Sequence, residues 1–164
     1  MVLSFGLRRS RAVAILSGLL AVVIIGLSSG PTPLEAAPQS SLTSSEGLIW
    51  QLRSYTDRQN NRVVVLPQSE ITIGFLDSGT LGGYAGCNWY AGLYETHEQD
   101  LRLLEGYTTR RACGAALDQQ ESNYYSALWR ATRYVLTGDT LDLFDSTGTL
   151  LASFVALPSD TRPR

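Results

Sequence analysis

The sequence predicts an α+β domain, in which a curved, barrel-like antiparallel β-sheet packs against one α-helix, preceded by an N-terminal signal or anchor helix. Three observations lead to this prediction. Most of the chain after residue 46 alternates apolar and polar residues with the two-residue period of a strand. One later segment instead repeats apolar residues at helical spacing. The chain also begins with arginines that precede a long apolar run.

The first 37 residues are predicted to be a signal peptide or an N-terminal membrane anchor. Arg8, Arg9 and Arg11 precede the apolar residues 12–27, the order found in export signals. Cutting after Ala36 would leave Leu34 where a small residue is preferred, so cleavage is only slightly favoured over retention. In both cases we expect the rest of the chain to be exported to the periplasm or cell envelope, either secreted or anchored by this segment.

The remaining chain has the composition of one globular domain. Of the 164 residues, 44% are hydrophobic and 17% are charged, and all 13 basic residues are arginine. Beyond residue 37 there are ten basic and 14 acidic residues and no basic stripe, so no nucleic-acid partner is expected. Residues 38–46 predict a flexible linker, residues 47–157 the domain, and residues 158–164 a disordered tail.

The strands of the domain are predicted from alternating apolar runs that end at turn sequences such as D-S-G and T-G-D. In chain order they cover residues 48–52, 62–66, 71–75, 80–84, 92–96, 101–107, 134–136, 140–144 and 149–155.

One helix is expected over residues 119–131. Asp118 and Glu121 have the spacing of a capping box, which places Asp118 at the N-cap. The face that packs on the sheet is predicted to consist of Tyr124, Tyr125, Leu128, Trp129 and Thr132.

Cys87 and Cys113 are predicted to form a disulfide. A catalytic cysteine needs a base, and the one histidine, His97, lies in the polar segment T-H-E-Q. Two cysteines and one histidine at this spacing match no zinc pattern. A disulfide requires only export and two cysteines, and closing about 26 residues would stabilise the fold by about 3–4 kcal/mol. We therefore favour the disulfide and expect no catalytic residue, metal or cofactor.

Two motifs around the cysteines resemble the META domain family, which includes HslJ-like heat-shock and envelope proteins. The segment G-C-N-W-Y-A-G-L-Y matches the first family motif at Gly86, Cys87, Asn88, Gly92 and Tyr94. The segment T-T-R-R-A-C matches the second at Thr109, Arg110, Ala112 and Cys113.

An acidic residue before a helix, here Glu121, completes the resemblance, which covers residues 47–156. Arg111 stands where the family has methionine, which implies a more exposed loop. The resemblance implies a compact antiparallel sheet against a helix, an envelope protein linked to stress, and an apolar groove. It implies no reaction.

The shared residues are expected to be mainly structural. Asn88 is expected to bond local backbone or to adopt a positive φ, with ligand binding as the alternative. Arg110 is expected to pair with Glu121, with an anionic ligand as the alternative. Gly86 and Gly92 are expected to serve backbone conformation rather than phosphate binding.

Trp89 and Tyr90 are the candidates for a partner surface. They are core residues by default, but they fall at an expected turn, where exposed aromatic rings would mark a lipid or protein surface. The function expected from these features is a non-enzymatic envelope domain that binds a lipid, an apolar ligand or an envelope protein. The alternatives are a purely structural, membrane-anchored interaction module and, less favoured, a cysteine-dependent enzyme.

Overall fold

The computed structural model describes Leu42, residues 47–76 and residues 78–158. The expected signal or anchor segment, most of the expected linker and residues 159–164 of the expected tail lie outside these residues. Leu42, within the expected linker, is buried, and its N–H donates to the Tyr134 hydroxyl. In the described part of the chain, no helix is long and apolar enough to cross a membrane.

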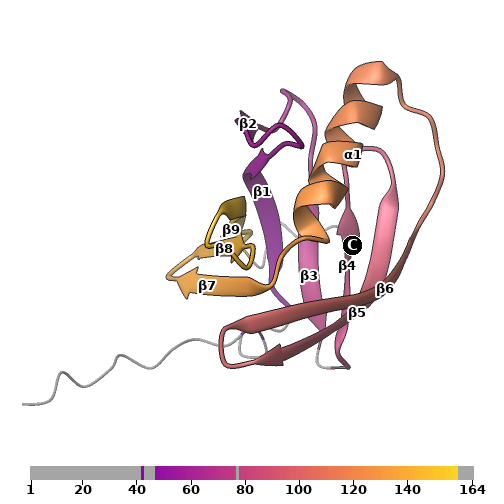
Figure 1. The fold of residues 1–164 in the computed structure, drawn as a ribbon. Coiled ribbons are helices and arrows are strands. Elements are labelled where there is room, and N and C mark those ends of the chain that lie inside the picture. The colour runs from indigo at the N-terminus through magenta and orange to yellow at the C-terminus, as the bar shows by residue number, and fades with distance from the viewer. Residues whose placement is uncertain (1–41, 43–46, 77, 159–164) are drawn as a thin grey trace, which may run out of the picture. The chain divides into compact units, whose positions relative to one another are not determined.

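The described residues form nine strands and one helix, shown in Figure 1. Their bounds are β1 Ile49–Thr56, β2 Arg62–Val64, β3 Thr72–Leu76, β4 Thr80–Tyr84, β5 Trp89–His97, β6 Asp100–Thr108, α1 Ala115–Leu128, β7 Arg133–Thr137, β8 Thr140–Phe144 and β9 Leu150–Ala156.

The strands pair in one antiparallel sheet that closes on itself. Hydrogen bonds join them in the order β2-β1-β3-β4-β5-β6-β7-β8-β9, and β1 also pairs with β9. Strand β1 accommodates three neighbours because β3 pairs with its residues 49–51 and β2 with its residues 54–56 on the same edge. The expected curved, barrel-like sheet with one helix is therefore present.

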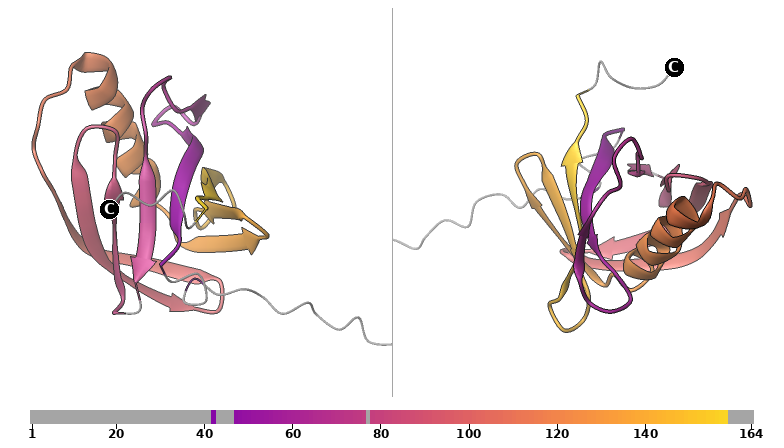
Figure 2. Two further views of the ribbon diagram at one scale, coloured as in Figure 1. Left: turned by 180° about the vertical axis from the view of Figure 1, so that it is seen from behind. Right: turned by 90° about the horizontal axis from the view of Figure 1, so that it is seen from above.

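The weakest pairing in the sheet lies between β6 and β7, at the single residue pair Asp100 and Arg133. Beyond that pair, β6 continues along β5 alone. Helix α1 lies in the connection between β6 and β7 and packs against the inner side of the curved sheet (Figures 1 and 2). Its Tyr124 contacts Tyr90 of β5 and Phe154 of β9.

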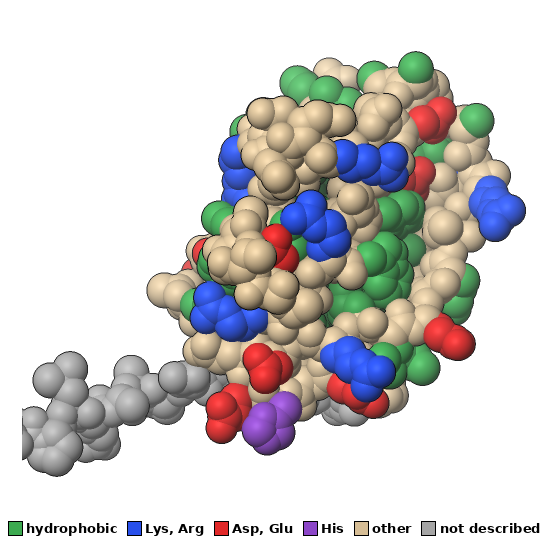
Figure 3. All heavy atoms as spheres, viewed as in Figure 1, with side chains coloured by type: hydrophobic (Ala, Val, Ile, Leu, Met, Phe, Trp, Pro, Cys, Tyr) green, Lys and Arg blue, Asp and Glu red, His purple; other side chains and the backbone are tan. Residues whose placement is uncertain are grey.

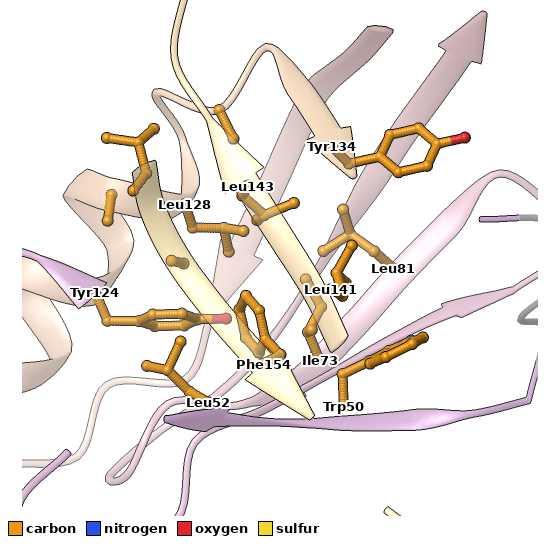
Figure 4. Packing of buried hydrophobic residues seen from close by; sticks show 14 of the residues in the cluster. Trp50, Leu52, Ile73, Leu81, Tyr124, Leu128, Tyr134, Leu141, Leu143 and Phe154 are labelled. Atoms are coloured by element: carbon orange, nitrogen blue, oxygen red, sulfur yellow. The ribbon is translucent and has the colours of Figure 1, made fainter. Parts of the chain in front are cut away.

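The hydrophobic core lies between the helix and the inner side of the sheet. Figure 4 shows Tyr124 and Leu128 of α1 beside Phe154 and Leu52, all of them at most 2% exposed. Burying an aliphatic or aromatic side chain of this size stabilises the fold by about 1.5–3 kcal/mol. The core therefore fixes this half of the helix on the sheet mainly by apolar contacts, to which the hydroxyls of Tyr124 and Tyr90, 2.6 Å apart, add one polar contact.

The helix begins four residues earlier than expected and ends three residues earlier. The N-cap is Gly114, at φ +97, and not Asp118. The Asp118 carboxylate instead accepts a hydrogen bond from the Cys113 N–H at 3.0 Å. The segment A-A-L over residues 115–117 is a good helix former, so the helix starts as soon as the glycine permits the change of direction.

Strand β5 begins at Trp89, whereas the sequence predicted a turn there and a strand from Gly92. Four residues, 85–88, suffice to connect β4 and β5, and the Ala85 N–H donates to the Asn88 carbonyl oxygen. The strands at 80–84 and 140–144 have the predicted bounds. Strand β2 ends two residues early, at Val64.

Candidate functional site

The Cys87–Cys113 disulfide is present, with a Cα–Cα distance of 5.9 Å and a sequence separation of 26. It joins the β4–β5 turn to the segment that leads into α1, as predicted. Both cysteines are used in this bond, and no free cysteine remains among the described residues. His97 ends β5 and is exposed.

Asn88 forms the centre of a buried hydrogen-bond network beside the disulfide. Its Oδ1 accepts from the Thr109 hydroxyl at 2.8 Å and from the Arg111 N–H at 2.7 Å. Its Nδ2 donates to the Arg111 carbonyl at 3.1 Å and to Glu121 Oε2 at 2.8 Å. All four hydrogen bonds that the amide can make are satisfied, so the structural role predicted for Asn88 is correct.

The bonds of Asn88 are nonetheless long-range, and its φ is not positive. The partners lie more than twenty residues away along the chain. Sequence reasoning does not reveal such distant contacts and therefore suggested a local role. Asn88 binds the backbone of Arg111, whose side chain is exposed. An arginine in place of methionine is therefore compatible with the network.

The predicted ion pair between Arg110 and Glu121 does not form. Arg110 is exposed, and neither of the two ion pairs among the described residues includes it. The Glu121 carboxylate is only 8% exposed and accepts from the Asn88 amide and, at 3.0 Å, from the Tyr125 hydroxyl. Neutral donors thus replace the guanidinium that the sequence suggested.

Gln120, which sequence reasoning missed, fixes the same half of the helix to a third loop. Its Oε1 accepts from the Leu66 N–H at 2.7 Å, and its Nε2 donates to the Ser69 hydroxyl at 2.8 Å. Gly86, at φ +91, lies against this contact, because an added Cβ would come within 2.8 Å of Ser69 Oγ. The conformational role expected for Gly86 agrees with this geometry.

Trp89 and Tyr90, the pair expected as a partner surface, point to opposite sides of the sheet. Successive strand residues alternate in direction, and accordingly Trp89 is 61% exposed whereas Tyr90 is 4% exposed. The Tyr90 hydroxyl donates to the Thr72 carbonyl at 2.8 Å and lies 2.6 Å from the Tyr124 hydroxyl. Tyr90 is therefore a core residue, and Trp89 alone is exposed.

A cleft lies between the second half of α1 and the end of β6, and we call it the helix–sheet cleft. Figure 3 shows hydrophobic side chains gathered in a hollow beside the helix. The cleft has a volume of about 200 Å³ and is lined by Tyr90, Leu104, Gly106, Tyr107, Thr108, Tyr125 and Trp129.

Two glycines determine the shape of this cleft. A Cβ on Gly106 would come within 2.6 Å of the Trp129 ring, and one on Gly92 within 3.1 Å of it. The ring therefore lies against bare backbone at the pair Gly92–Gly106. The family motif includes Gly92, whereas Gly106 was missed, although an isolated glycine inside a strand signals a close approach.

Tyr94, the last motif residue, lies in the core. Its ring meets Phe75 edge to face with centroids 5.0 Å apart, and its hydroxyl donates to the Leu76 carbonyl at 3.1 Å. It takes no part in the cleft.

The Tyr125 hydroxyl at the cleft remains protonated at neutral pH. Burial, followed by the hydrogen bond and charge of Glu121, raises the pKa of Tyr125 above its ordinary value of 10.0. Tyr125 thus donates to Glu121 and lies 3.0 Å from the Thr108 hydroxyl. The cleft combines aromatic and aliphatic walls with a few fixed hydroxyl groups, the composition of sites that bind apolar molecules.

Comparisons with known proteins agree with this fold. The family model of the META domain matches residues 42–156. An NMR structure of a protein from Burkholderia xenovorans is similar, with a TM-score of 0.59 and 22% identity over 81% of this chain and 98% of that chain. A second NMR structure has a TM-score of 0.51 and 17% identity over 66% of this chain and 87% of that chain. No curated protein matches.

Proposed function

Because this chain belongs to the META domain family, we propose that it is a non-enzymatic, exported envelope domain that holds an apolar molecule in the helix–sheet cleft. The observation that carries this proposal is the apolar lining of the cleft at a place open to solvent. Tyr107 is 76% exposed and Trp129 is 39% exposed at its mouth. Aromatic side chains left in water beside a concavity are typical of a surface that a ligand covers.

The size of the cleft restricts what it would hold. Its volume of about 200 Å³ is below the range of about 300–1,000 Å³ common for drug-sized ligands. The proposed occupant is therefore one ring or one segment of a lipid acyl chain, with the rest of the molecule outside. The hydroxyls of Thr108 and Tyr125 would bind a polar group next to that segment.

Export is supported by two features at different places in the chain. The arginine-then-apolar order of residues 8–27 is that of an export signal, and a structural disulfide is characteristic of proteins outside the cytoplasm. A role in stress is the expectation for the family, and holding an apolar molecule or an envelope protein would be its physical basis. Retention of the N-terminal segment would make the domain a membrane-anchored module instead.

Native mass spectrometry of the exported protein, purified without reductant, tests the proposal. The protein mass reports whether the first 37 residues remain and whether the cysteines are paired. We expect a reproducible non-covalent adduct of lipid size that is lost on collisional activation. A clean apo mass, together with no saturable binding of a fluorescent fatty acid, would refute the proposed binding function.

A matched pair of variants places the ligand. Leu104→Gln puts an amide in the cleft wall, and we expect fatty-acid affinity to fall about tenfold, corresponding to about 1.4 kcal/mol of lost apolar contact. The control is Leu66→Gln, which makes the same change at a leucine that is 37% exposed and does not line the cleft. Equal effects of the two substitutions would show that the fatty acid binds elsewhere.

A further inference from the structure

The outer side of the sheet carries a second apolar surface, which meets the helix–sheet cleft at Gly106 and Tyr107. In the strand register, Gly74 of β3 pairs with Gly82 of β4, and Gly82 pairs with Ala91 of β5. Three adjacent strands thus present no side chain larger than a methyl group along one row. Gly82 and Ala91 form the floor of a groove that runs across the strands, which we call the outer trough, whereas Gly74 is buried beside it.

Two rows of larger side chains flank this floor. On one side, Tyr84 pairs with Trp89 across β4 and β5, and their ring centroids are 5.1 Å apart. On the other side, Leu76 pairs with Thr80, and Thr80 pairs with Leu93. Trp89, Leu76 and Leu93 are 61%, 52% and 46% exposed, respectively. The trough therefore has apolar walls that are left in water.

The trough is long enough for a chain-like ligand. It consists of two hollows of about 670 and 690 Å³ that both include Gly82 in their lining. One hollow reaches Tyr107 of β6, and the other reaches Ile49 of β1. From β1 to β6 there are four strand spacings, or about 19 Å. That length corresponds to about six residues of extended polypeptide.

Backbone conformation does not explain Gly74 and Gly82, because neither has a positive φ. A Cβ on Gly74 would approach a flexible Ile49 methyl at 3.2 Å, and one on Gly82 would approach the Tyr90 carbonyl at 3.2 Å, so in both cases the neighbour would have to shift by a few tenths of an ångström. Gly83 contrasts with both, since a Cβ there would overlap the Thr72 carbonyl.

Glycine inside a strand weakens the strand and commonly marks a place where a ligand or another backbone approaches closely. Gly82 is such a glycine, because it lines both hollows of the trough and is only partly buried. The absence of a side chain at Gly82 would therefore let an occupant rest directly on the backbone.

The charges around the trough select among occupants. Glu70 lines one hollow and Glu105 the other, and no arginine among residues 47–76 and 78–158 lines either of them. Carboxylates without basic residues repel nucleic acid and anionic lipid surfaces and attract cations. The exposed face of Trp89 also favours a guanidinium or ammonium group.

We propose that the outer trough binds an extended segment of another protein whose apolar residues are flanked by basic residues. The apolar residues would cover Leu76, Leu93 and Trp89, and the basic residues would lie near Glu70 and Glu105. The three apolar side chains that this segment would cover do not line the helix–sheet cleft.

Two synthetic hexapeptides with the same apolar centre test the proposal, one with arginine at both ends and the other with glutamate. Each is titrated calorimetrically into the purified full chain. We expect saturable binding of the arginine peptide, about tenfold tighter than that of the glutamate peptide at low salt. The difference should shrink as salt is raised. In the double variant Glu70→Gln and Glu105→Gln, it should fall to about twofold or less.

Variants of exposed side chains locate the peptide. Trp89→Ala and Leu93→Gln should each weaken binding of the arginine peptide about tenfold. Leu66→Gln, the same kind of change outside the trough, and Leu104→Gln, in the cleft, should leave it unchanged. Thermal unfolding of each variant shows whether the domain is folded, and the exposed positions of Trp89 and Leu93 favour an unchanged transition.

Four results would overturn the proposal. The first is that neither peptide binds, and the second is that both bind equally well and independently of Trp89. The third is a concentration-dependent dimer that Trp89→Ala abolishes, which would assign the trough to a second copy of this chain. The fourth is peptide binding that appears only when Arg162 and Arg164 are both changed to Gln, which would assign the trough to the chain's own C-terminal segment.

Discussion

The two halves of helix α1 are attached to the sheet by different kinds of contact. The first half uses Gln120 and Glu121, buried polar side chains that bond the loops before β3 and β5. The second half uses Tyr124 and Leu128 in the core and the Trp129 ring against glycine backbone. The disulfide reinforces only the first half.

This difference explains why the cleft lies where it does. Hydrogen bonds are directional, so each loop at the first half of the helix has one favourable position. Apolar contacts have no preferred direction, so the second half can leave a cleft beside the Trp129 ring without an unpaired polar group. Fixing one end of the helix firmly permits an open, apolar site at the other.

Removing the disulfide should have the largest effect on stability. For Cys87→Ser with Cys113→Ser, we expect the free energy of unfolding to fall by about 3–4 kcal/mol, because the unfolded chain regains the freedom of a closed loop of roughly 26 residues. Urea unfolding measures the change. A loss below about 1 kcal/mol would mean that the hydrogen-bond network holds these segments without the covalent bond.

Asn88→Ala should have the next largest effect, a loss of about 2–3 kcal/mol, because it leaves the buried Glu121 carboxylate short of a donor and the Arg111 backbone unpaired. Asn61→Ala is the matched control, since its exposed amide bonds only Asp57, and it should cost less than about 1 kcal/mol. Similar losses in the two variants would contradict a central role for Asn88.

The pair formed by Tyr90 of β5 and Tyr124 of α1 makes stability sensitive to high pH. Burial raises the pKa of Tyr90 and of Tyr124 above 10.0, so their contribution is complete below pH 10 and is lost as pH rises above it. Above pH 10, the ionisation of each of these two tyrosines in the unfolded chain should lower the free energy of unfolding by about 1.4 kcal/mol per pH unit.

Tyr124→Phe removes one of these groups. Above pH 10, we expect the free energy of unfolding to fall less steeply with pH, by about 1.4 kcal/mol per pH unit. At neutral pH the variant should be about 1 kcal/mol less stable, because it lacks the hydrogen bond to Tyr90. Urea unfolding between pH 8 and 11 measures both. An unchanged slope would show that Tyr124 ionises as readily in the folded protein as in the unfolded chain.

Arg130→Gln should have the smallest effect. Arg130 follows the apolar half of the helix, and its guanidinium meets Asp145 at 3.1 Å on the surface. Exposed ion pairs contribute about 0–1 kcal/mol, so the midpoint of thermal unfolding should hardly change. A large shift would mean that this half of the helix also depends on polar contacts.

Sequence reasoning predicted the sheet and the disulfide well but not the polar contacts of the helix. Alternation along 80–84 and 140–144 was enough to define those strands, because one side of each faces the core. The capping box at Asp118 failed because Gly114 begins the helix earlier. Arg110 and Glu121 have suitable charges, but the carboxylate turns inward to Asn88 while the guanidinium remains in water.

The sequence by itself determined the fold class, the disulfide and the motif residues, because local periodicity and cysteine chemistry do not depend on distant partners. Only the tertiary structure decided which aromatic rings face water. Pairing across the sheet separated Trp89 from Tyr90 and brought Gly92 and Gly106 together under Trp129. The same pairing aligned Gly74, Gly82 and Ala91. Both proposed sites exist because strand register places residues from different strands in one row, and no single stretch of sequence contains that row.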